Sequence, residues 1–151
     1  MTQHRFLLLF FVGTFLACGS YAQQNDEFAI YKSYIKKVGE KVSIDEGADL
    51  VELAIVGTPY DHAGYGIPSR RNETFMVYEI PGKYEGIIAW LAVNPWTGDV
   101  WNMNECTLFS NPGLLKAQAT IKKKFNKIEL KEYDRLHHIK PYREYDLEPC
   151  P

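Results

Sequence analysis

Apolar side chains recur at helical spacing in two segments of the chain. Across residues 27–38 they recur every three or four positions with lysines on the opposite side, which predicts an amphipathic helix. A second helix is predicted from Pro112 to Phe125, because Ser110 and Asn111 supply a capping oxygen and Pro112 suits the first turn. Its inward face is expected to consist of Leu114, Ala117, Ile121 and Phe125.

Strand patterns lie between these two helices. Residues 74–80 alternate, and residues 86–93 form the nearly continuous apolar run that is typical of a central strand. Pro95 and Gly98 favour a reversal at residues 94–99, so residues 100–103 are predicted to return as the second strand of a β-hairpin. Residues 49–57 fit a helix or a strand, and the β-branched residues before Pro59 favour a strand.

Two segments are predicted to lack a long regular element. Glycine and proline bar regular structure from residues 57–72, which we expect to form a long loop. The tail, residues 126–151, is predicted to contain a short helix near residues 131–138 and then an extended stretch.

The amino terminus resembles an export signal. Arg5 precedes an apolar segment at residues 6–17, and the small-residue site Ser20-Tyr21-Ala22 follows. We therefore predict a signal peptide at residues 1–22, a single domain at residues 23–151, and a secreted or periplasmic location. Two alternatives are an uncleaved membrane anchor, for which the apolar segment is short of the roughly 20 residues required, and lipid modification at Cys18.

Export leaves Cys106 and Cys150 in an oxidising compartment, so we predict that they form a disulfide. Such a bond would constrain the unfolded chain by up to roughly 4 kcal/mol. The alternative is a reactive Cys106 paired with His62, His137 or His138. The order of elements then predicts an α+β fold, in which an amino-terminal helix and a second helix pack on an antiparallel sheet and the disulfide anchors the carboxyl-terminal tail.

The net charge and the absence of certain motifs argue against several classes of function. Cleavage would leave 16 basic and 19 acidic side chains, a net charge of −3, which argues against nucleic acid as a partner. No second apolar run is long enough to cross a membrane. The adjacent His137 and His138 would point about 100 degrees apart on a helix, and we expect neither a metal site nor a cofactor.

Binding is the chemistry that the sequence favours. The loop at residues 57–72 carries the aromatic, imidazole and guanidinium groups that dominate binding hot spots, and Trp96 in the hairpin turn is expected to be exposed beside them. The predicted contact residues are Tyr60, Asp61, His62, Tyr65, Arg70, Arg71 and Trp96. Three alternatives are a plain surface connector, a structural domain of an envelope assembly, and a small secreted hydrolase of cell-wall or peptide substrates that uses Asp61, His62 and a glutamate.

The hairpin sequence also carries a family resemblance. The run Ile87-Ile88-Ala89-Trp90-Leu91-Ala92-Val93-Asn94-Pro95-Trp96-Thr97-Gly98-Asp99-Val100-Trp101 resembles the hairpin of PepSY-like domains. PepSY-like and cystatin-like folds pack a helix on an antiparallel sheet, and many act as inhibitors or binding modules. The resemblance implies a protein partner, such as a secreted enzyme or toxin that an inhibitor or immunity protein blocks through the loop at residues 57–72. The long loop and the cysteine-anchored tail depart from that family pattern.

Overall fold

The computed structural model describes residues 33–34, 36–61, 67–71, 75–82, 84, 86–143 and 150–151, without the side chains of residues 67–71. The chain divides into two compact units, residues 1–36 and residues 37–151. The predicted signal peptide lies outside the described residues, as does most of the helix predicted at residues 27–38. The fold below is that of the second unit.

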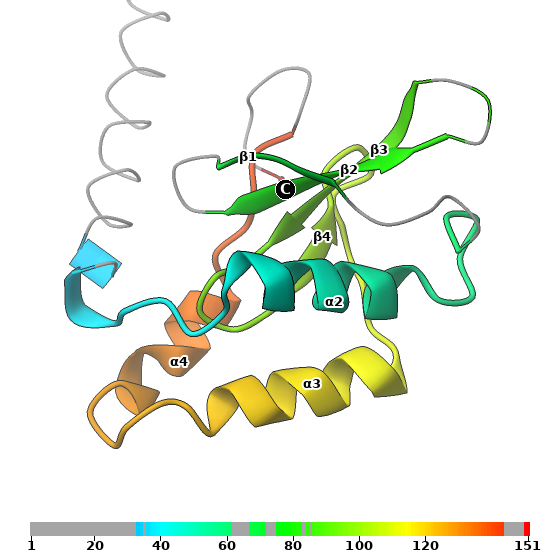
Figure 1. Cartoon of the computed structure of the whole chain (residues 1–151). Helices are drawn as coiled ribbons and strands as arrows, with labels where there is room; N and C mark the ends of the chain where they lie inside the picture. Colours follow the sequence, from blue (N-terminus) through cyan, green and yellow to red (C-terminus); the bar gives the residue numbers. More distant parts are fainter. Residues whose placement is uncertain are drawn as a thin grey trace, which may run out of the picture. The chain divides into compact units, whose positions relative to one another are not determined.

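The second unit is an α+β fold built on one antiparallel sheet (Figure 1). Its five strands lie in the order β1-β2-β3-β4-β5, so each strand pairs with its neighbour in sequence. The strands are β1 (Ile67–Arg71), β2 (Met76–Pro81), β3 (Ile87–Val93), β4 (Val100–Asn102) and β5 (Thr107–Leu108). The helices are α2 (Ile44–Ile55), α3 (Pro112–Lys122) and α4 (Leu130–His137). Helix α2 lies against the sheet and α3 packs beside α2, so the predicted fold class, hairpin and carboxyl-terminal helices are confirmed.

Helix α2 corrects the strand that was predicted at residues 49–57. Ser43 accepts a hydrogen bond from the Glu46 amide, and the Glu46 side chain accepts one from the Ser43 amide, which forms a capping box. Leu50, Val51 and Ala54 are buried at helical spacing along the same element. The capping box begins the helix upstream of the β-branched residues, and burial of one helical face outweighs their strand preference.

The sheet face toward α2 forms the core. The register places Met76 opposite Val93 and Tyr78 opposite Leu91, and all four side chains are buried. The Tyr78 hydroxyl donates a 2.7 Å hydrogen bond to the Ile44 carbonyl. A Cβ at Gly47 would lie 2.1 Å from the Tyr78 hydroxyl oxygen, so only glycine lets α2 approach the sheet this closely.

Strand β1 corrects part of the loop that was predicted at residues 57–72. It pairs antiparallel with β2, and its register shifts between Pro68 and Arg70. Proline is tolerated here because β1 is an edge strand with an irregular register, where a missing N–H costs no interior ladder bond. The short strand β5 was not predicted.

The tail is fastened back to the sheet by the predicted disulfide. Cys106, in the turn between β4 and β5, bonds to Cys150, with 5.3 Å between their Cα atoms. The Cys150 amide also donates to the Pro141 carbonyl, and the Arg143 Nε lies 3.4 Å from the Cys106 sulfur. A reactive Cys106 thiol is thereby excluded in this oxidised form. Within the described part of the chain, no helix has both the length and the apolarity to cross a bilayer.

Candidate functional site

The first part of the predicted binding loop is a compact turn after α2. Gly57 has a φ of 75°, and its amide donates a 2.9 Å hydrogen bond to the Asp61 carboxylate. The Thr58 hydroxyl donates to the Ile55 carbonyl at the end of the helix. Asp61 is exposed, but one of its carboxylate oxygens accepts the Gly57 amide bond. Tyr60 lies between the residues that make these two hydrogen bonds, so its backbone position is defined.

Tyr60 joins this turn to the β4–β5 turn. Its hydroxyl accepts a 3.1 Å hydrogen bond from the Asn102 side-chain amide and lies 3.3 Å from the Glu105 carboxylate, to which it donates. Asn102 is fully buried, and its side-chain oxygen accepts from the Asn104 and Glu105 amides. The network holds Tyr60 and Glu105 in fixed positions, because a buried amide with satisfied partners does not readily rearrange.

The β2–β3 hairpin ends beside these turns in exposed apolar side chains. Tyr84 at its tip is 85% exposed, and Ile87 and Ile88 at the start of β3 are 43% and 46% exposed. Strand β4 pairs with Leu91, Ala92 and Val93 of β3, so the beginning of β3 extends past the end of β4.

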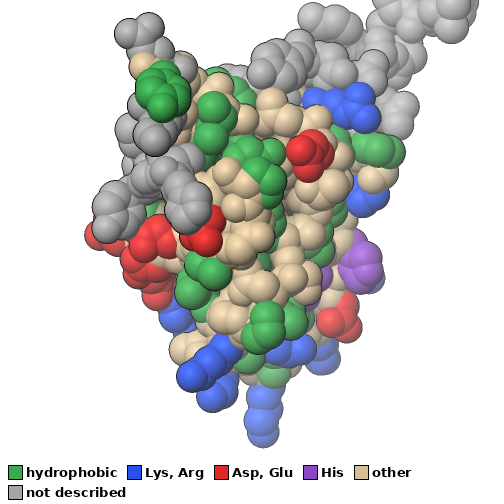
Figure 2. All heavy atoms as spheres, turned by 90° about the vertical axis from the view of Figure 1, so that its right-hand side faces the viewer, with side chains coloured by type: hydrophobic (Ala, Val, Ile, Leu, Met, Phe, Trp, Pro, Cys, Tyr) green, Lys and Arg blue, Asp and Glu red, His purple; other side chains and the backbone are tan. Residues whose placement is uncertain are grey.

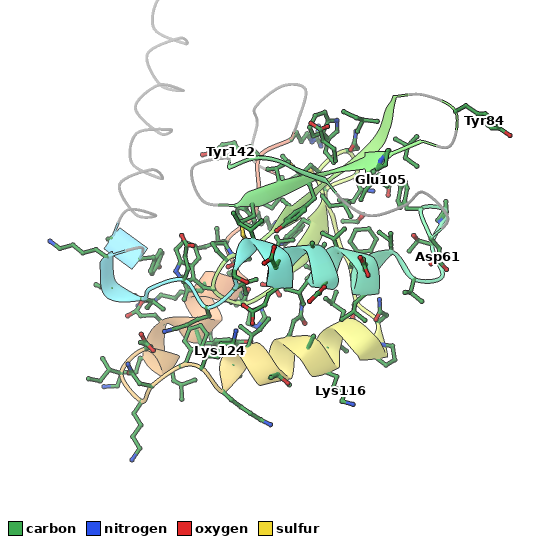
Figure 3. The ribbon with its side chains drawn as sticks, viewed as in Figure 1. Asp61, Tyr84, Glu105, Lys116, Lys124 and Tyr142 are labelled. Atoms are coloured by element: carbon green, nitrogen blue, oxygen red, sulfur yellow. A yellow bond between two sulfur atoms is a disulfide. The ribbon has the colours of Figure 1, made fainter. Side chains whose placement is uncertain are left out.

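These residues gather on one side of the molecule. Figure 3 shows Asp61, Tyr84 and Glu105 on the right-hand side, with Tyr84 pointing away from the sheet. Figure 2 shows the same side, with hydrophobic side chains spread over it, acidic side chains at its left edge and on its right, and Lys and Arg side chains both at its lower end and at the upper right. We call Tyr60, Asp61, Tyr84, Ile87, Ile88 and Glu105 the hairpin-tip surface. Ile87 and Ile88 are successive residues of β3, so their side chains point to opposite faces of the strand.

The predicted contact residues have three outcomes. Tyr60 and Asp61 lie on the hairpin-tip surface. His62 and Tyr65 fall outside the described residues, and so do the side chains of Arg70 and Arg71, whose backbones belong to β1. The remaining prediction, an exposed Trp96, is wrong.

Trp96 is fully buried although it sits in a tight turn. Its indole N–H donates a 2.7 Å hydrogen bond to the Val38 carbonyl, and its backbone amide donates to the Asn94 side-chain oxygen. The Pro95 carbonyl beside it accepts from the Lys41 and Val42 amides. Chain segments far away in sequence therefore cover this turn, and a local turn pattern cannot reveal them.

The same turn contains a polar network that the sequence did not reveal. Asp99 accepts from the Thr97 hydroxyl at 2.6 Å, and His137 Nδ1 lies 2.7 Å from the same carboxylate oxygen. The other ring nitrogen, Nε2, lies 2.6 Å from the Tyr133 hydroxyl. A neutral imidazole with its proton on Nδ1 satisfies both contacts, donating to Asp99 and accepting from Tyr133.

An Asp–His pair is typical of hydrolases, but here the pair connects structural elements. The Tyr133 hydroxyl is hydrogen-bonded to Nε2 of His137, the ring nitrogen that a catalytic base would direct toward its substrate. Burial, together with the charges of Asp99 and Asp134, raises the pKa of Tyr133 to about 12, so this phenol stays protonated. The network ties α4 to the β3–β4 turn. Elsewhere in the described residues, no three His, Cys, Asp or Glu side chains are grouped so as to hold a metal ion.

Comparison of the chain with protein-family models, with curated proteins and with solved structures finds no match. The PepSY-like resemblance of the hairpin therefore stays a prediction from its residues.

Proposed function

We propose that this chain is an exported protein-binding module, an inhibitor or immunity protein that blocks a partner enzyme through the hairpin-tip surface. The observation that carries the proposal is the exposed apolar end of the β2–β3 hairpin. Tyr84, Ile87 and Ile88 keep much of their apolar area in contact with water. Large apolar side chains exposed together at one end of a hairpin, here on both faces of β3, are typical of an interaction site.

The neighbouring polar contacts support the same function. Tyr60 is held by Asn102 and Glu105, so little side-chain freedom is lost when a partner packs against it. Tyrosine is also among the side chains that contribute most at protein interfaces. The hairpin-tip surface thus offers a rigid aromatic group beside exposed aliphatic ones. His62, Tyr65, Arg70 and Arg71 remain further contact candidates on sequence grounds.

The proposal is tested by capture of the partner with two matched variants. The purified protein, with its disulfide intact, is crosslinked to the exported proteins of its host, and captured chains are identified by mass spectrometry. Tyr84→Ala should weaken binding at least about tenfold. Leu115→Ala removes an exposed apolar side chain from α3 and should leave binding unchanged. Equal binding by both variants would show that the hairpin tip is not the contact.

The captured protein is then used in an inhibition assay. If it is an enzyme, the parent protein should inhibit its activity, and Tyr84→Ala should inhibit it less. Binding without inhibition would leave a binding module and reject the inhibitor assignment. Turnover of a peptide or cell-wall substrate by the purified protein itself, abolished by His62→Ala, would instead establish the hydrolase alternative.

A further inference from the structure

A second exposed surface lies at the connection between α3 and α4, and its composition differs from that of the hairpin-tip surface. Ile128 in this connection is 79% exposed and Leu130 is 40% exposed. Exposed lysines surround them in the sequence on both sides. We call this group the lysine loop, which consists of Lys122, Lys123, Lys127, Ile128, Leu130 and Lys131.

The lysine loop is ordered by its own hydrogen bonds. The Asn126 side-chain oxygen accepts from the Ile128 and Glu129 amides at 2.9 and 3.0 Å. The Glu129 carboxylate accepts a 2.9 Å hydrogen bond from the Asn126 amide in return. These reciprocal bonds fix the backbone on both sides of Ile128. Its apolar side chain is therefore held out in solvent by a defined turn.

Three of the acidic groups near the lysine loop already have partners. Glu129 pairs with Lys41 at 2.9 Å, and the Asn126 amide together with Lys41 holds the Glu129 pKa below its usual range. Glu46 pairs with Lys124, and Glu132 pairs with Arg135. Among the described residues, Lys123, Lys127 and Lys131 have no carboxylate within ion-pair distance. The surface consequently presents uncompensated positive charge around a protruding isoleucine.

We propose that the lysine loop binds the surface of an anionic phospholipid membrane, with Ile128 entering the headgroup region and the lysines contacting lipid phosphates. A lipid interface can take up a single protruding apolar side chain without a matching pocket, whereas a protein partner needs a complementary one. Each lysine close to an anionic membrane surface raises the affinity for that membrane about fivefold, so three lysines together raise it on the order of a hundredfold. Burial of Ile128 adds about tenfold.

This inference is independent of the proposed function, because it concerns different residues. Figure 1 shows the connection between α3 and α4 at the lower left and the β2–β3 hairpin at the upper right, where Figure 3 labels the exposed Tyr84. The lysine loop would place the protein at a membrane, and the hairpin tip would remain available for its partner.

Sedimentation with lipid vesicles tests the inference. The protein is purified as its host exports it and mixed with vesicles of phosphatidylcholine alone or of equal parts phosphatidylglycerol and phosphatidylcholine. We expect binding to the anionic vesicles that weakens as salt is added, since screening shortens the range of the attraction. The triple variant Lys123→Gln, Lys127→Gln, Lys131→Gln should bind on the order of a hundredfold more weakly, and Ile128→Ser about tenfold more weakly.

The matched control changes the same number of exposed lysines elsewhere. Lys37→Gln, Lys116→Gln, Lys140→Gln alters the net charge equally, and all three side chains are exposed. Circular dichroism and the thermal midpoint verify that every variant folds. Equal weakening by the control triple, or equal binding to both kinds of vesicle, would overturn the inference. Competition by soluble polyglutamate together with no effect of Ile128→Ser would also overturn it, in favour of a polyanionic protein partner.

Discussion

Two turns at opposite ends of strand β3 have similar residues and opposite environments. The β2–β3 turn contains Gly86 at a φ of 87° and carries Tyr84 out into solvent. The β3–β4 turn contains Gly98 at a φ of 75° and buries Trp96 completely. Each combines an aromatic side chain with a glycine in the left-handed region.

The difference arises from what else in the chain reaches each turn. The β3–β4 turn is enclosed by the segment before α2, by α3 and by α4. Asn94 donates to the Leu136 carbonyl, and the Gln118 amide donates to the Gly98 carbonyl. The β2–β3 turn projects beyond the end of β4. A turn sequence therefore specifies the reversal of the chain, and the tertiary neighbours decide whether the turn belongs to the core or to the binding surface.

The largest contrast is expected from the two aromatic side chains. Trp96→Ala should lower the free energy of unfolding by about 3–5 kcal/mol, because it leaves a cavity and an unpaired Val38 carbonyl. Tyr84→Ala, the matched change in the exposed turn, should alter it by no more than about 0.5 kcal/mol. Urea unfolding measures both values. Similar losses in the two variants would contradict the assigned environments.

Reduction of the Cys106–Cys150 disulfide should have the next largest effect. The bond closes a separation of 44 residues, and its loss is expected to lower the free energy of unfolding by up to about 4 kcal/mol. The freed tail begins just after α4. Helix α4 encloses the β3–β4 turn through the Leu136 carbonyl, which accepts from Asn94. Amide hydrogen exchange at Trp96 and Thr97 should therefore accelerate on reduction. Unchanged protection at these amides would mean that α4 stays docked without the disulfide.

The two glycines separate backbone strain from packing. An alanine at either position adopts a left-handed conformation, which costs about 1–2 kcal/mol. At Gly86 nothing lies within 4 Å of the added Cβ, so Gly86→Ala should cost no more than that. At Gly98 the Cβ would lie 2.6 Å from the Ile121 Cδ1, and overpacking should bring the total for Gly98→Ala to about 2–4 kcal/mol. Thermal unfolding of the pair provides the measurement, and equal midpoints would argue against close packing at Gly98.

The smallest effect concerns alkaline pH. Burial raises the pKa of Tyr133 from the ordinary value of 10.0 to about 12, and burial does the same for Tyr78. The unfolded chain loses these protons first, so stability is complete below pH 10 and falls as pH rises from about 10 to about 12. Tyr133→Phe should make that fall shallower, whereas Tyr84→Phe in the exposed turn should leave its slope unchanged. Urea midpoints across this pH range test the pair, and an identical slope in Tyr133→Phe and the parent would count against the Tyr133 shift.

The local elements were predictable from the sequence to an unequal degree. The hairpin and α3 followed from short-range signals: the nearly continuous apolar run of β3, the turn residues Pro95 and Gly98, and the asparagine and proline at residues 111–112. Helix α2 was missed because β-branched residues were weighed above the Ser43 and Glu46 pair, whose spacing is the capping-box signal. Strand β1 was missed because Pro68 suggested a loop, and pairing with β2 is not encoded within β1 itself.

The candidate site was predictable only where it is local. Tyr60 and Asp61 were identified by residue type, but the hydrogen bonds of Tyr60 to Asn102 and Glu105 join segments more than 40 residues apart. The burial of Trp96 and the contact of Asp99 with His137 depend on similar distant contacts. The lysine loop was not predicted, because the exposure of Ile128 depends on the turn around Asn126.

The enclosure of Trp96 also sets an order of events for the newly made chain. Its partner Val38 lies 58 residues earlier, and Leu136, whose carbonyl accepts from Asn94, lies 42 residues after Asn94. The hairpin can form by itself as soon as its two strands have been synthesised, but its turn stays exposed to solvent until both distant segments pack against it. Folding of this domain should therefore be limited by these long-range contacts rather than by the hairpin, and burial of the Trp96 indole should be among its last steps.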